Sequence, residues 1–347
     1  MSSWLAEIVR SEGGRISFER FMELALYHPV HGYYTRHISA IGRSGDFSTA
    51  TTIGDSLMRS LASWLKAEAK QLSMPIAQVI ELGGGTGQLA AGILRSFPPW
   101  QRIRYQIVEI SGTLRRFQEG ELRGRCVQWT NSVEAALLAA KGEAILISNE
   151  FVDAFPCQRF EQGERGWKEI NLALEEDLWM EEDSDNRAPP ASSTFSVKYA
   201  NGQRVETLQS YRKWLTDLNR HLRRGTMLTI DYGGSPAEIY HRKPGGTIRA
   251  YFRHQRIEGS GIYMRAGHQD LTSDVNFVDL KEWGEQLGFE TVQLVSQADF
   301  IRQWAKPRSA TQPLADDYVA EESGMGEAFK VLHQRKLLDG WRTSTYW

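Results

Sequence analysis

The sequence predicts an α/β protein with a mostly parallel sheet that is wound with helices. Two observations support this fold class. From Ile76 onward, short apolar runs alternate with segments of helical periodicity, which is typical of a parallel sheet with crossover helices. The first apolar run also ends in a glycine-rich turn that opens a helix, as in Rossmann-type folds.

The N-terminal part is expected to be mainly helical. Apolar residues recur at helical spacing between residues 4 and 28. Residues 28–52 are rich in glycine, serine, threonine and aromatic residues, and this stretch is expected to be a long functional loop. A further helix is expected at about 55–71. We therefore expect residues 1–75 to form a helical and loop region that caps the active site.

The remainder, 76–347, is expected to be one domain with an insertion at about 155–205. Within the insertion, alternating residues indicate hairpin strands, and an acidic stretch and the breaker APPASS follow them. A helix is expected at 205–224, because Arg223 and Arg224 precede a glycine there. The predicted strands of the sheet itself are 77–82, 104–110, 125–129, 144–150 and 226–234.

Composition excludes several classes of protein. The 347 residues are 41% hydrophobic and 24% charged, so extensive disorder is not expected. The formal net charge of -2 gives no reason to expect a nucleic acid or a membrane as the main partner. Only two cysteines are present, and the N-terminus has no long apolar run, so we expect a cytoplasmic location. The sequence does not indicate an oligomeric state.

The glycine turn predicts a cofactor that carries no phosphate. Its spacing lacks the last glycine of a dinucleotide fingerprint and the Lys-Ser/Thr of a phosphate-binding loop. Glu81 precedes the turn, and a carboxylate there repels a pyrophosphate but attracts an ammonium or a sulfonium. The alternative is a tight strand–helix turn without a ligand. The glycines of the turn are Gly83, Gly84, Gly85 and Gly87.

A second acid narrows the identity of the cofactor. Glu109 ends the second predicted strand, where an acid can accept hydrogen bonds from both ribose hydroxyls of an adenosine. Together with Glu81 and the turn, it predicts S-adenosylmethionine, with the adenosine on Glu109 and the amino-acid tail against the glycines. Further candidate cofactor contacts are Ile110, Gln128 and Trp129.

The string ISNEFVDAFP places polar residues at the end of the fourth predicted strand. Open α/β sheets bind ligands at this edge, and a carboxylate there can hold a guanidinium through two hydrogen bonds. We expect Asn149, Glu150 and Asp153 to face the methyl acceptor, although Asp153 is equally compatible with capping the next helix. Glu150 is the preferred proton acceptor, with Asp46 as the alternative.

No metal site is predicted. His28 and His31 have a spacing that could serve a metal, but Pro29 breaks a helix between them and no third ligand is near in sequence.

Several unusual strings resemble the MidA-type S-adenosylmethionine-dependent methyltransferases. They occur in a fixed order over nearly the full length: YHPVHGYYT, GDFST, ELGGGTGQLAAGIL, YQIVEISGTLRRFQ, SNEFVDAFP, DYGG, GTIRAYFRHQ and DLTSDVNF. This family includes the mitochondrial arginine methyltransferase that is needed for assembly of respiratory complex I.

The resemblance implies a Rossmann-like class I methyltransferase fold, with a seven-stranded sheet, a helical N-terminal extension and an inserted substrate-facing region. It also implies cofactor contacts, a loop that closes over the cofactor and a substrate-facing group. The cofactor contacts are Gly83, Gly85, Gly87 and Glu109, the loop is Gly45, Asp46 and Phe47, and the substrate-facing residues are Asn149, Glu150 and Asp153.

We therefore expect a methyltransferase that acts on a protein arginine. Two alternatives stay open. One is methylation of an oxygen, nitrogen or carbon of a small molecule, and the other is a non-catalytic assembly or interaction protein that keeps the cofactor-binding fold. This chain departs from the family pattern at one place that bears on the identity of the methyl acceptor. The family carries Ser-Pro-Glu where this chain has Ala50, Thr51 and Thr52.

Overall fold

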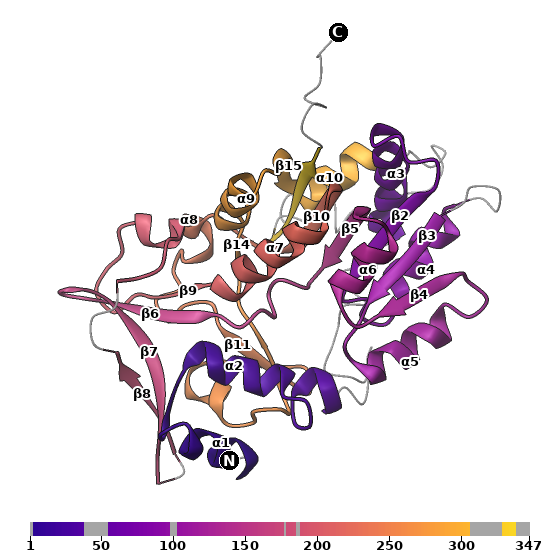
Figure 1. Ribbon diagram of the computed structural model, residues 1–347. Helices are drawn as coiled ribbons and strands as arrows, with labels where there is room; N and C mark the ends of the chain where they lie inside the picture. The colour runs from indigo at the N-terminus through magenta and orange to yellow at the C-terminus, as the bar shows by residue number, and fades with distance from the viewer. Residues whose placement is uncertain are drawn as a thin grey trace. The chain divides into compact units, whose positions relative to one another are not determined.

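The computed structural model describes residues 3–37, 55–97, 103–176, 178–184, 188–305 and 328–337. Backbone proximity divides the chain into two compact units, each built from three segments. Figure 1 labels their helices and strands. Unit 1 consists of residues 1–48, 152–213 and 232–279, and unit 2 consists of residues 49–151, 214–231 and 280–347.

Unit 2 contains the expected sheet. Its strand order is β15-β16-β10-β5-β2-β3-β4, and β14 pairs with the end of β10. The pairs from β10 to β4 are parallel, whereas β15 and β16 are antiparallel. The bounds are β2 (Ala77–Leu82), β3 (Ile103–Val108), β4 (Val127–Thr130), β5 (Glu143–Asn149), β10 (Arg224–Gly234), β15 (Glu290–Ser296) and β16 (Phe329–Lys336). This confirms the predicted fold class.

Helices cover both faces of this sheet. Contacts link α5 to α4, α4 to α3, and α3 to α10, whereas α6 packs on β3 and β4. Gln106 of β3 donates a hydrogen bond to the backbone oxygen of Ala136 in α6. Its neighbour Ile107 pairs with Trp129 of β4, and Trp129 donates a hydrogen bond to α5. Because side chains alternate along a strand, α5 and α6 lie on opposite faces. The bounds are α3 (Asp55–Gln71), α4 (Gln88–Arg95), α5 (Gly112–Glu121), α6 (Val133–Ala139) and α10 (Gln297–Trp304).

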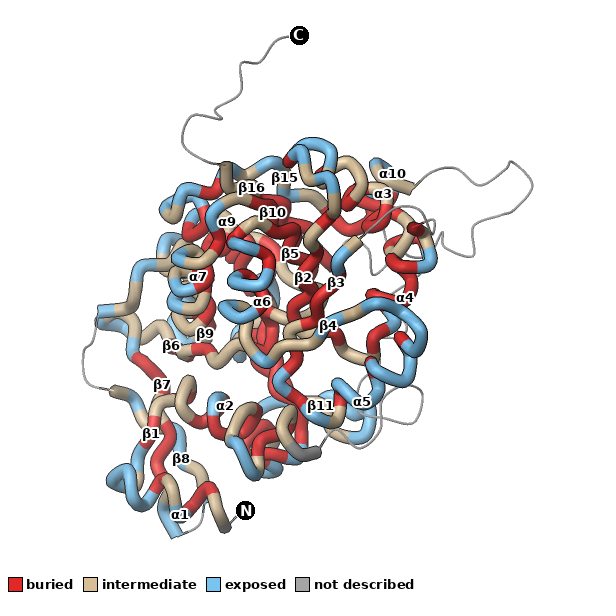
Figure 2. The backbone as a smooth tube through the Cα atoms, turned by 45° about the vertical axis from the view of Figure 1, so that its right-hand side comes forward, coloured by how far each residue is buried: buried red, intermediate tan, exposed pale blue. Residues whose placement is uncertain are grey.

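The core of unit 2 explains why these segments form central strands. Their residues are almost continuously buried, as Figure 2 shows for β2, β5 and β10. A strand that is covered on both faces needs apolar residues at successive positions, and not at alternate ones only. Four residues of β5 meet this need, namely Ala144, Ile145, Leu146 and Ile147, and each has no exposed surface.

Unit 1 is a second assembly of helices and short sheets. Its larger sheet has the order β1-β7-β6-β9, with β8 on β7, and its smaller sheet is β12-β11-β13. The predicted hairpin strands of the insertion are present as β6 (Gln158–Gly163), β7 (Gly166–Glu175) and β8 (Leu178–Asp183). Other elements of unit 1 include α1 (Ser3–Ser11), β1 (Arg15–Ser17), α2 (Phe18–Tyr27), a π-helical turn (Tyr33–His37), β9 (Arg204–Thr207), α8 (Pro236–Ile239), β11 (Arg249–Phe252), β12 (Gln255–Ile257), β13 (Asp270–Thr272) and β14 (Val275–Asn276).

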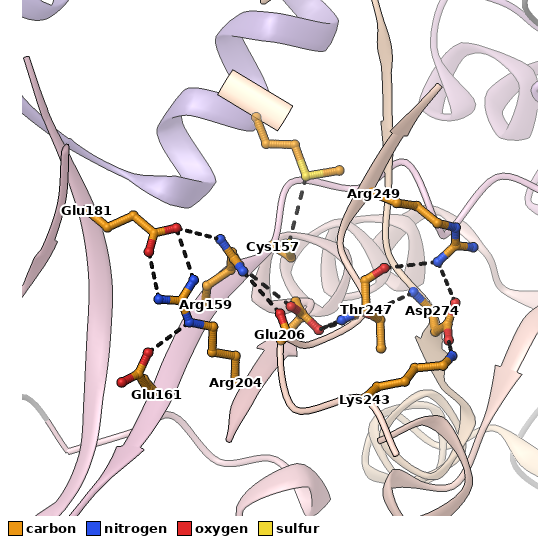
Figure 3. A network of polar contacts seen from close by, with 12 residues as sticks. Cys157, Arg159, Glu161, Glu181, Arg204, Glu206, Lys243, Thr247, Arg249 and Asp274 are labelled. Carbon is orange, nitrogen blue, oxygen red and sulfur yellow. Dashed lines mark hydrogen bonds and ion pairs between the residues drawn. The ribbon is translucent and has the colours of Figure 1, made fainter. Parts of the chain in front are cut away.

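A buried ion network holds the strands of unit 1 together (Figure 3). Arg159 of β6 is 3% exposed and lies between Glu181 of β8 and Glu206 of β9. Glu206 also accepts hydrogen bonds from the backbone and the hydroxyl of Thr247, at 2.9 and 2.8 Å. Arg204 pairs with Glu181 at 2.7 Å. These contacts compensate charges that would otherwise be costly to bury.

Residues 205–207 differ from the prediction. The segment 205–224 was expected to be helical throughout, but Arg204–Thr207 forms β9, and helix α7 spans only Gln209–His221. The strand pairs with β6, from Gln158↔Thr207 to Glu161↔Arg204. Partners distant in sequence therefore override the local helical pattern.

The two units also cut across the expected domain boundaries. Helix α3 was expected in an N-terminal region, but it packs on α4 and α10 within unit 2. The insertion joins residues 1–48 and 232–279 in unit 1. Three elements cross from one unit to the other along the chain, namely α7, β10 and α9 (Phe277–Gln286).

Glu68 gives a test of how α3 is held on the sheet. It is 5% exposed, and Arg335 of β16 donates to it at 2.8 and 3.3 Å. Burial raises the pKa of Glu68, but hydrogen bonds from His333 and Arg335 outweigh this effect, so the pKa lies below its usual 4.5. The ionised form therefore stabilises the fold above pH 4.5, and this contribution is lost as the pH falls.

Glu68→Gln should lower the free energy of unfolding by roughly 2 kcal/mol at pH 7, because a charged hydrogen-bond acceptor is lost. The deficit should shrink below pH 4.5, as measured by urea denaturation. Glu282→Gln, at an exposed position of α9, is the control. A deficit that does not depend on pH would contradict the ion-pair explanation.

Candidate cofactor and acceptor site

The register of the sheet brings the predicted site residues to one edge. Leu82 of β2 lies opposite Val108 of β3 and Ser148 of β5. The residues that follow these three are Gly83, Glu109 and Asn149. This edge is where the strand order reverses on either side of β2, and such positions bind ligands in open α/β sheets.

The glycine turn needs its glycines for two physical reasons. Gly83, Gly85 and Gly87 have φ values of 68°, 52° and 88°, a region that residues with a side chain rarely adopt. A Cβ on Gly84 would instead lie 2.7 Å from Cγ2 of Ile107. A Cβ on Gly85 would meet no atom within 4 Å, so this part of the turn borders open space in which a ligand can lie.

Glu81 is a buried carboxyl directly before the turn. It is 2% exposed and accepts a hydrogen bond of 2.9 Å from the hydroxyl of Tyr105. Burial raises the pKa of Glu81 to about 8, the hydrogen bond from Tyr105 opposes this shift, and the charge of Glu109 adds to it. A cationic ligand beside the turn would favour the ionised form of Glu81.

Glu109 has the geometry expected of a ribose acceptor. One of its oxygens accepts the backbone N–H of Ser111 at 2.8 Å, and the other accepts the side-chain amide of Gln118 at 2.9 Å. A carboxylate has about four lone-pair sites, so the group keeps acceptor capacity for the hydroxyls of a bound ribose. Burial raises the pKa of Glu109, and hydrogen bonds from the backbone of Ser111, the side chain of Gln118 and the backbone of Ile110 oppose the shift.

Of the remaining predicted cofactor contacts, Ile110 and Trp129 lie near Glu109, whereas Gln128 does not take part in its hydrogen bonds. Ile110 is 53% exposed immediately after Glu109, as a contact for an adenine ring requires. Trp129 donates its indole N–H to Gln118 at 2.9 Å and is thereby joined to Glu109. Gln128, the residue before Trp129 on β4, is exposed and points to the opposite face of the strand. It therefore does not join the hydrogen bonds between Trp129, Gln118 and Glu109.

The end of β5 is held in an unusual conformation. Glu150 has a φ of 51°, which is rare for a residue with a side chain and is often found at functional sites. Its backbone N–H donates to Ile230 at 2.9 Å, and the next N–H, that of Phe151, donates to the buried carboxylate of Asp231 at 3.2 Å. The side-chain amide of Asn149 donates to Glu150 at 3.3 Å.

Asp153 belongs to unit 1, where it lies in a separate group of buried polar residues. It accepts a hydrogen bond from Tyr232, and Asp270 accepts one from Tyr34 at 2.9 Å. Burial raises the pKa of Asp153 to about 6 and that of Asp270 to about 7. Nearby, Arg249 pairs with Asp274 at 2.6 Å, as Figure 3 shows.

The sequence also indicated a loop and a pair of histidines. Gly45, Asp46 and Phe47, and the departure at 50–52, lie outside the described residues. The rings of His28 and His31 both pack on Trp4, at 4.9 Å between centroids. Among the described residues, no cluster of three or more His, Cys, Asp or Glu could hold a metal ion.

Three residues contact these groups without having been predicted to do so, namely Gln118, Phe151 and Asp231. Gln118 has no exposed surface and lies in the middle of α5, where a glutamine usually faces water. A Cβ on Gly83 would approach the ring of Phe151 to 3.0 Å. All three lie within the strings that carry the family resemblance, but only Asp231, an acid at the end of an apolar strand, has a physical signal of its own in the sequence.

A comparison of the whole chain with known families decides its class. The model of the family described as "Putative S-adenosyl-L-methionine-dependent methyltransferase" matches residues 60–295, which is more than half of the chain. The chain belongs to this family. It is therefore an S-adenosylmethionine-dependent methyltransferase, and the predicted cofactor and reaction class are confirmed.

Named relatives and a solved structure agree with this assignment. The zebrafish (Danio rerio) mitochondrial protein arginine methyltransferase NDUFAF7 is 28% identical over 309 residues, covering 79% of this chain and 70% of that protein. The Caenorhabditis elegans homologue is 23% identical and covers 95% and 85%, respectively. A Burkholderia thailandensis structure with bound S-adenosyl-homocysteine is 27% identical, has a TM-score of 0.83, and covers 97% of this chain and 92% of that one.

Unit 2 can supply binding and orientation for this chemistry. S-adenosylmethionine carries its methyl group on a sulfonium, which is already a strong electrophile. The protein therefore needs chiefly to position the partners and to exclude water. Glu109 and the open side of the turn at Gly85 fit the ribose and the amino-acid tail, respectively. Within unit 2, Asn149 and Glu150 are the polar groups at the adjacent strand end.

Gly84 gives a test of the turn. Gly84→Ala should weaken binding of S-adenosyl-homocysteine by roughly tenfold or more, because the new methyl group must displace Ile107 and the amide of Gln118. Calorimetric titration measures this effect. Gly112→Ala is the matched control, since a Cβ there meets nothing within 4 Å. Equal affinity in both variants would show that the turn is not closely packed.

Glu81 gives a test by pH. The folded protein binds the proton of Glu81 more tightly than the unfolded chain does. Protonated Glu81 therefore adds most to the free energy of unfolding below pH 4.5. Its contribution is lost as the pH rises to about 8. Glu81→Gln should therefore become more stable than the parent protein as the pH rises from 5 to 8.5, measured by denaturation without ligand. A stability difference that stays constant over this range would contradict the raised pKa.

Proposed function

We propose that this methyltransferase modifies an arginine side chain of a protein. The observation that carries the proposal is the position of Glu150. It is an acid at the end of β5, in strained backbone, next to the strand end that opens the glycine turn. A carboxylate can hold a guanidinium through two hydrogen bonds and leave one nitrogen directed at the methyl group.

The relatives support the same acceptor. Zebrafish, mouse and human proteins that resemble this chain over more than three quarters of its length are named protein arginine methyltransferases. We propose the same acceptor class for this chain, with a role in assembly of respiratory complex I as the finer proposal.

Residue roles follow from charge and contacts. Glu150 would bind the guanidinium and take up the proton released after transfer, and Asn149 would orient Glu150 through its amide. Asp153 stays a candidate contact of the methyl acceptor from the sequence; within unit 1, burial raises the pKa of Asp153 to about 6 and that of Asp270 to about 7, and a cation there would favour their ionised forms. Asp46 stays a candidate proton acceptor from the sequence.

We also propose a cytoplasmic location. Cys126 and Cys157 are both free thiols, which fits a reducing compartment, although the animal relatives are named as mitochondrial. Among the described residues, no helix has both the length and the apolar character needed to span a membrane. Cell fractionation with compartment markers tests the location.

The acceptor can be identified from the modified amino acid. Purified protein is incubated with methyl-labelled S-adenosylmethionine and a cell extract, and the protein fraction is then hydrolysed. We expect the label in methylarginine. Glu150→Gln should reduce labelling by about a hundredfold or more, because a charged group that binds the acceptor is lost. It should bind S-adenosyl-homocysteine with unchanged affinity, and Glu109→Ala should lose both.

Other outcomes overturn the proposal in distinguishable ways. Label that stays in the small-molecule fraction would favour a small-molecule acceptor, and label in methyllysine would contradict the guanidinium. An absence of label from every fraction, with S-adenosyl-homocysteine still bound, would favour a non-catalytic assembly role. Glu134→Gln, at an exposed site on α6, controls for loss of surface charge.

A further inference from the structure

Gln118 connects three parts of unit 2 that are distant in sequence. Its side-chain amide nitrogen donates to the backbone oxygen of Gly85 at 3.0 Å and to the carboxylate of Glu109 at 2.9 Å. Its amide oxygen accepts the indole N–H of Trp129 at 2.9 Å. The side chain has no exposed surface, and its hydrogen bond to Glu109 is buried.

Its partners fix the orientation of the amide. The carbonyl of Gly85 can only accept a hydrogen bond, and the indole N–H of Trp129 can only donate one. The amide nitrogen must therefore face the turn and the oxygen must face β4. Among the standard side chains, only an amide offers two N–H donors and one acceptor in this arrangement, and asparagine is one methylene shorter.

The same side chain also determines the position of the turn. A Cβ on Gly84 would lie 3.0 Å from the amide nitrogen of Gln118, and a Cβ on Gly87 would lie 3.1 Å from its Cα. The backbone of the turn thus packs directly on Gln118. A change at this residue would release the turn and Glu109 together.

We propose that Gln118 is a positioning residue that makes cofactor binding selective for a ribose with both hydroxyls. It holds the carboxylate of Glu109 in one rotamer, together with the N–H of Ser111. Each carboxylate oxygen then accepts a hydrogen bond from the protein, and the remaining lone pairs of the carboxylate are directed at the ribose hydroxyls. Without Gln118, Glu109 rotates and no longer receives both hydroxyls.

This role differs measurably from simple support of the fold. Loss of general packing lowers the affinity for every cofactor analogue by the same factor. Loss of the Glu109 rotamer lowers affinity chiefly for analogues that carry both hydroxyls. It also shifts the pH dependence of binding, because burial raises the pKa of Glu109 and the hydrogen bond from Gln118 opposes that rise.

The experiment compares S-adenosyl-homocysteine with its 2′-deoxy analogue by calorimetric titration. The unmodified protein should prefer the ribose form by about tenfold or more, the effect of one hydrogen bond to a charged group. In Gln118→Met, which keeps the length and removes all three hydrogen bonds, this preference should fall to within about threefold. The acid limb of the binding profile should move to higher pH.

Two further variants make the test decisive. Gln106→Met removes another buried glutamine, whose amide bonds only to Ala136 among the described contacts, and it should keep the full ribose preference. Trp129→Phe removes the donor to Gln118 but keeps an aromatic ring, and it should lose part of the preference. Since each preference is a ratio within one sample, a partly unfolded preparation does not alter it.

The results separate this proposal from the cofactor assignment. If the unmodified protein does not bind S-adenosyl-homocysteine, the cofactor assignment itself fails. If it binds, and the ribose preference is unchanged in a folded Gln118→Met or Trp129→Phe sample, then Gln118 supports the fold only. An equal loss of affinity for both analogues in Gln118→Met leads to the same conclusion.

Discussion

The parallel register of β3, β2, β5 and β10 is the constraint on which the site depends. Parallel strands end at the same edge, so residues far apart in sequence become neighbours there. The pairs Leu82↔Val108 and Leu82↔Ser148 align the glycine turn with Glu109 and Asn149, and Ile230↔Asn149 adds Asp231. A shift of one residue in any of these pairs would turn the following side chain away from the ligand.

Buried carboxyls give this edge its chemical character. Glu81 and Glu109 are nearly inaccessible, and their hydrogen bonds come from neutral groups, namely a phenol, a backbone N–H and an amide. Neutral donors satisfy the oxygens without neutralising the charge, so the raised pKa values persist. Carboxyls with raised pKa values gain most from a cationic ligand, because the cation favours their ionised form, and this agrees with the cofactor of this family.

The fold was predictable wherever local pattern and tertiary environment agree. The helix expected at 55–71 is α3, and the strand expected at 77–82 is β2, because each carries its own periodicity and clear ends. Local pattern failed at 205–207, which form β9 because β6 offers backbone partners there. It also gave no indication of β1, a strand of three residues that exists through its pairing with β7. The spacing of nearby residues carries no information about hydrogen bonds to a strand that is distant in sequence.

The sequence by itself determined the cofactor class, because the glycines, Glu81 and Glu109 lie on one strand–turn–helix–strand unit whose geometry is local. It also placed Asn149 and Glu150 at a strand end. Only the tertiary structure decided which groups control Glu109, since Gln118 reaches it from within α5 and Trp129 reaches Gln118 from β4. Likewise, the strained φ of Glu150 and the contact of Asp231 with Phe151 exist because β10 lies beside β5. These contacts arise from the way the elements pack, and no spacing within a single segment encodes them.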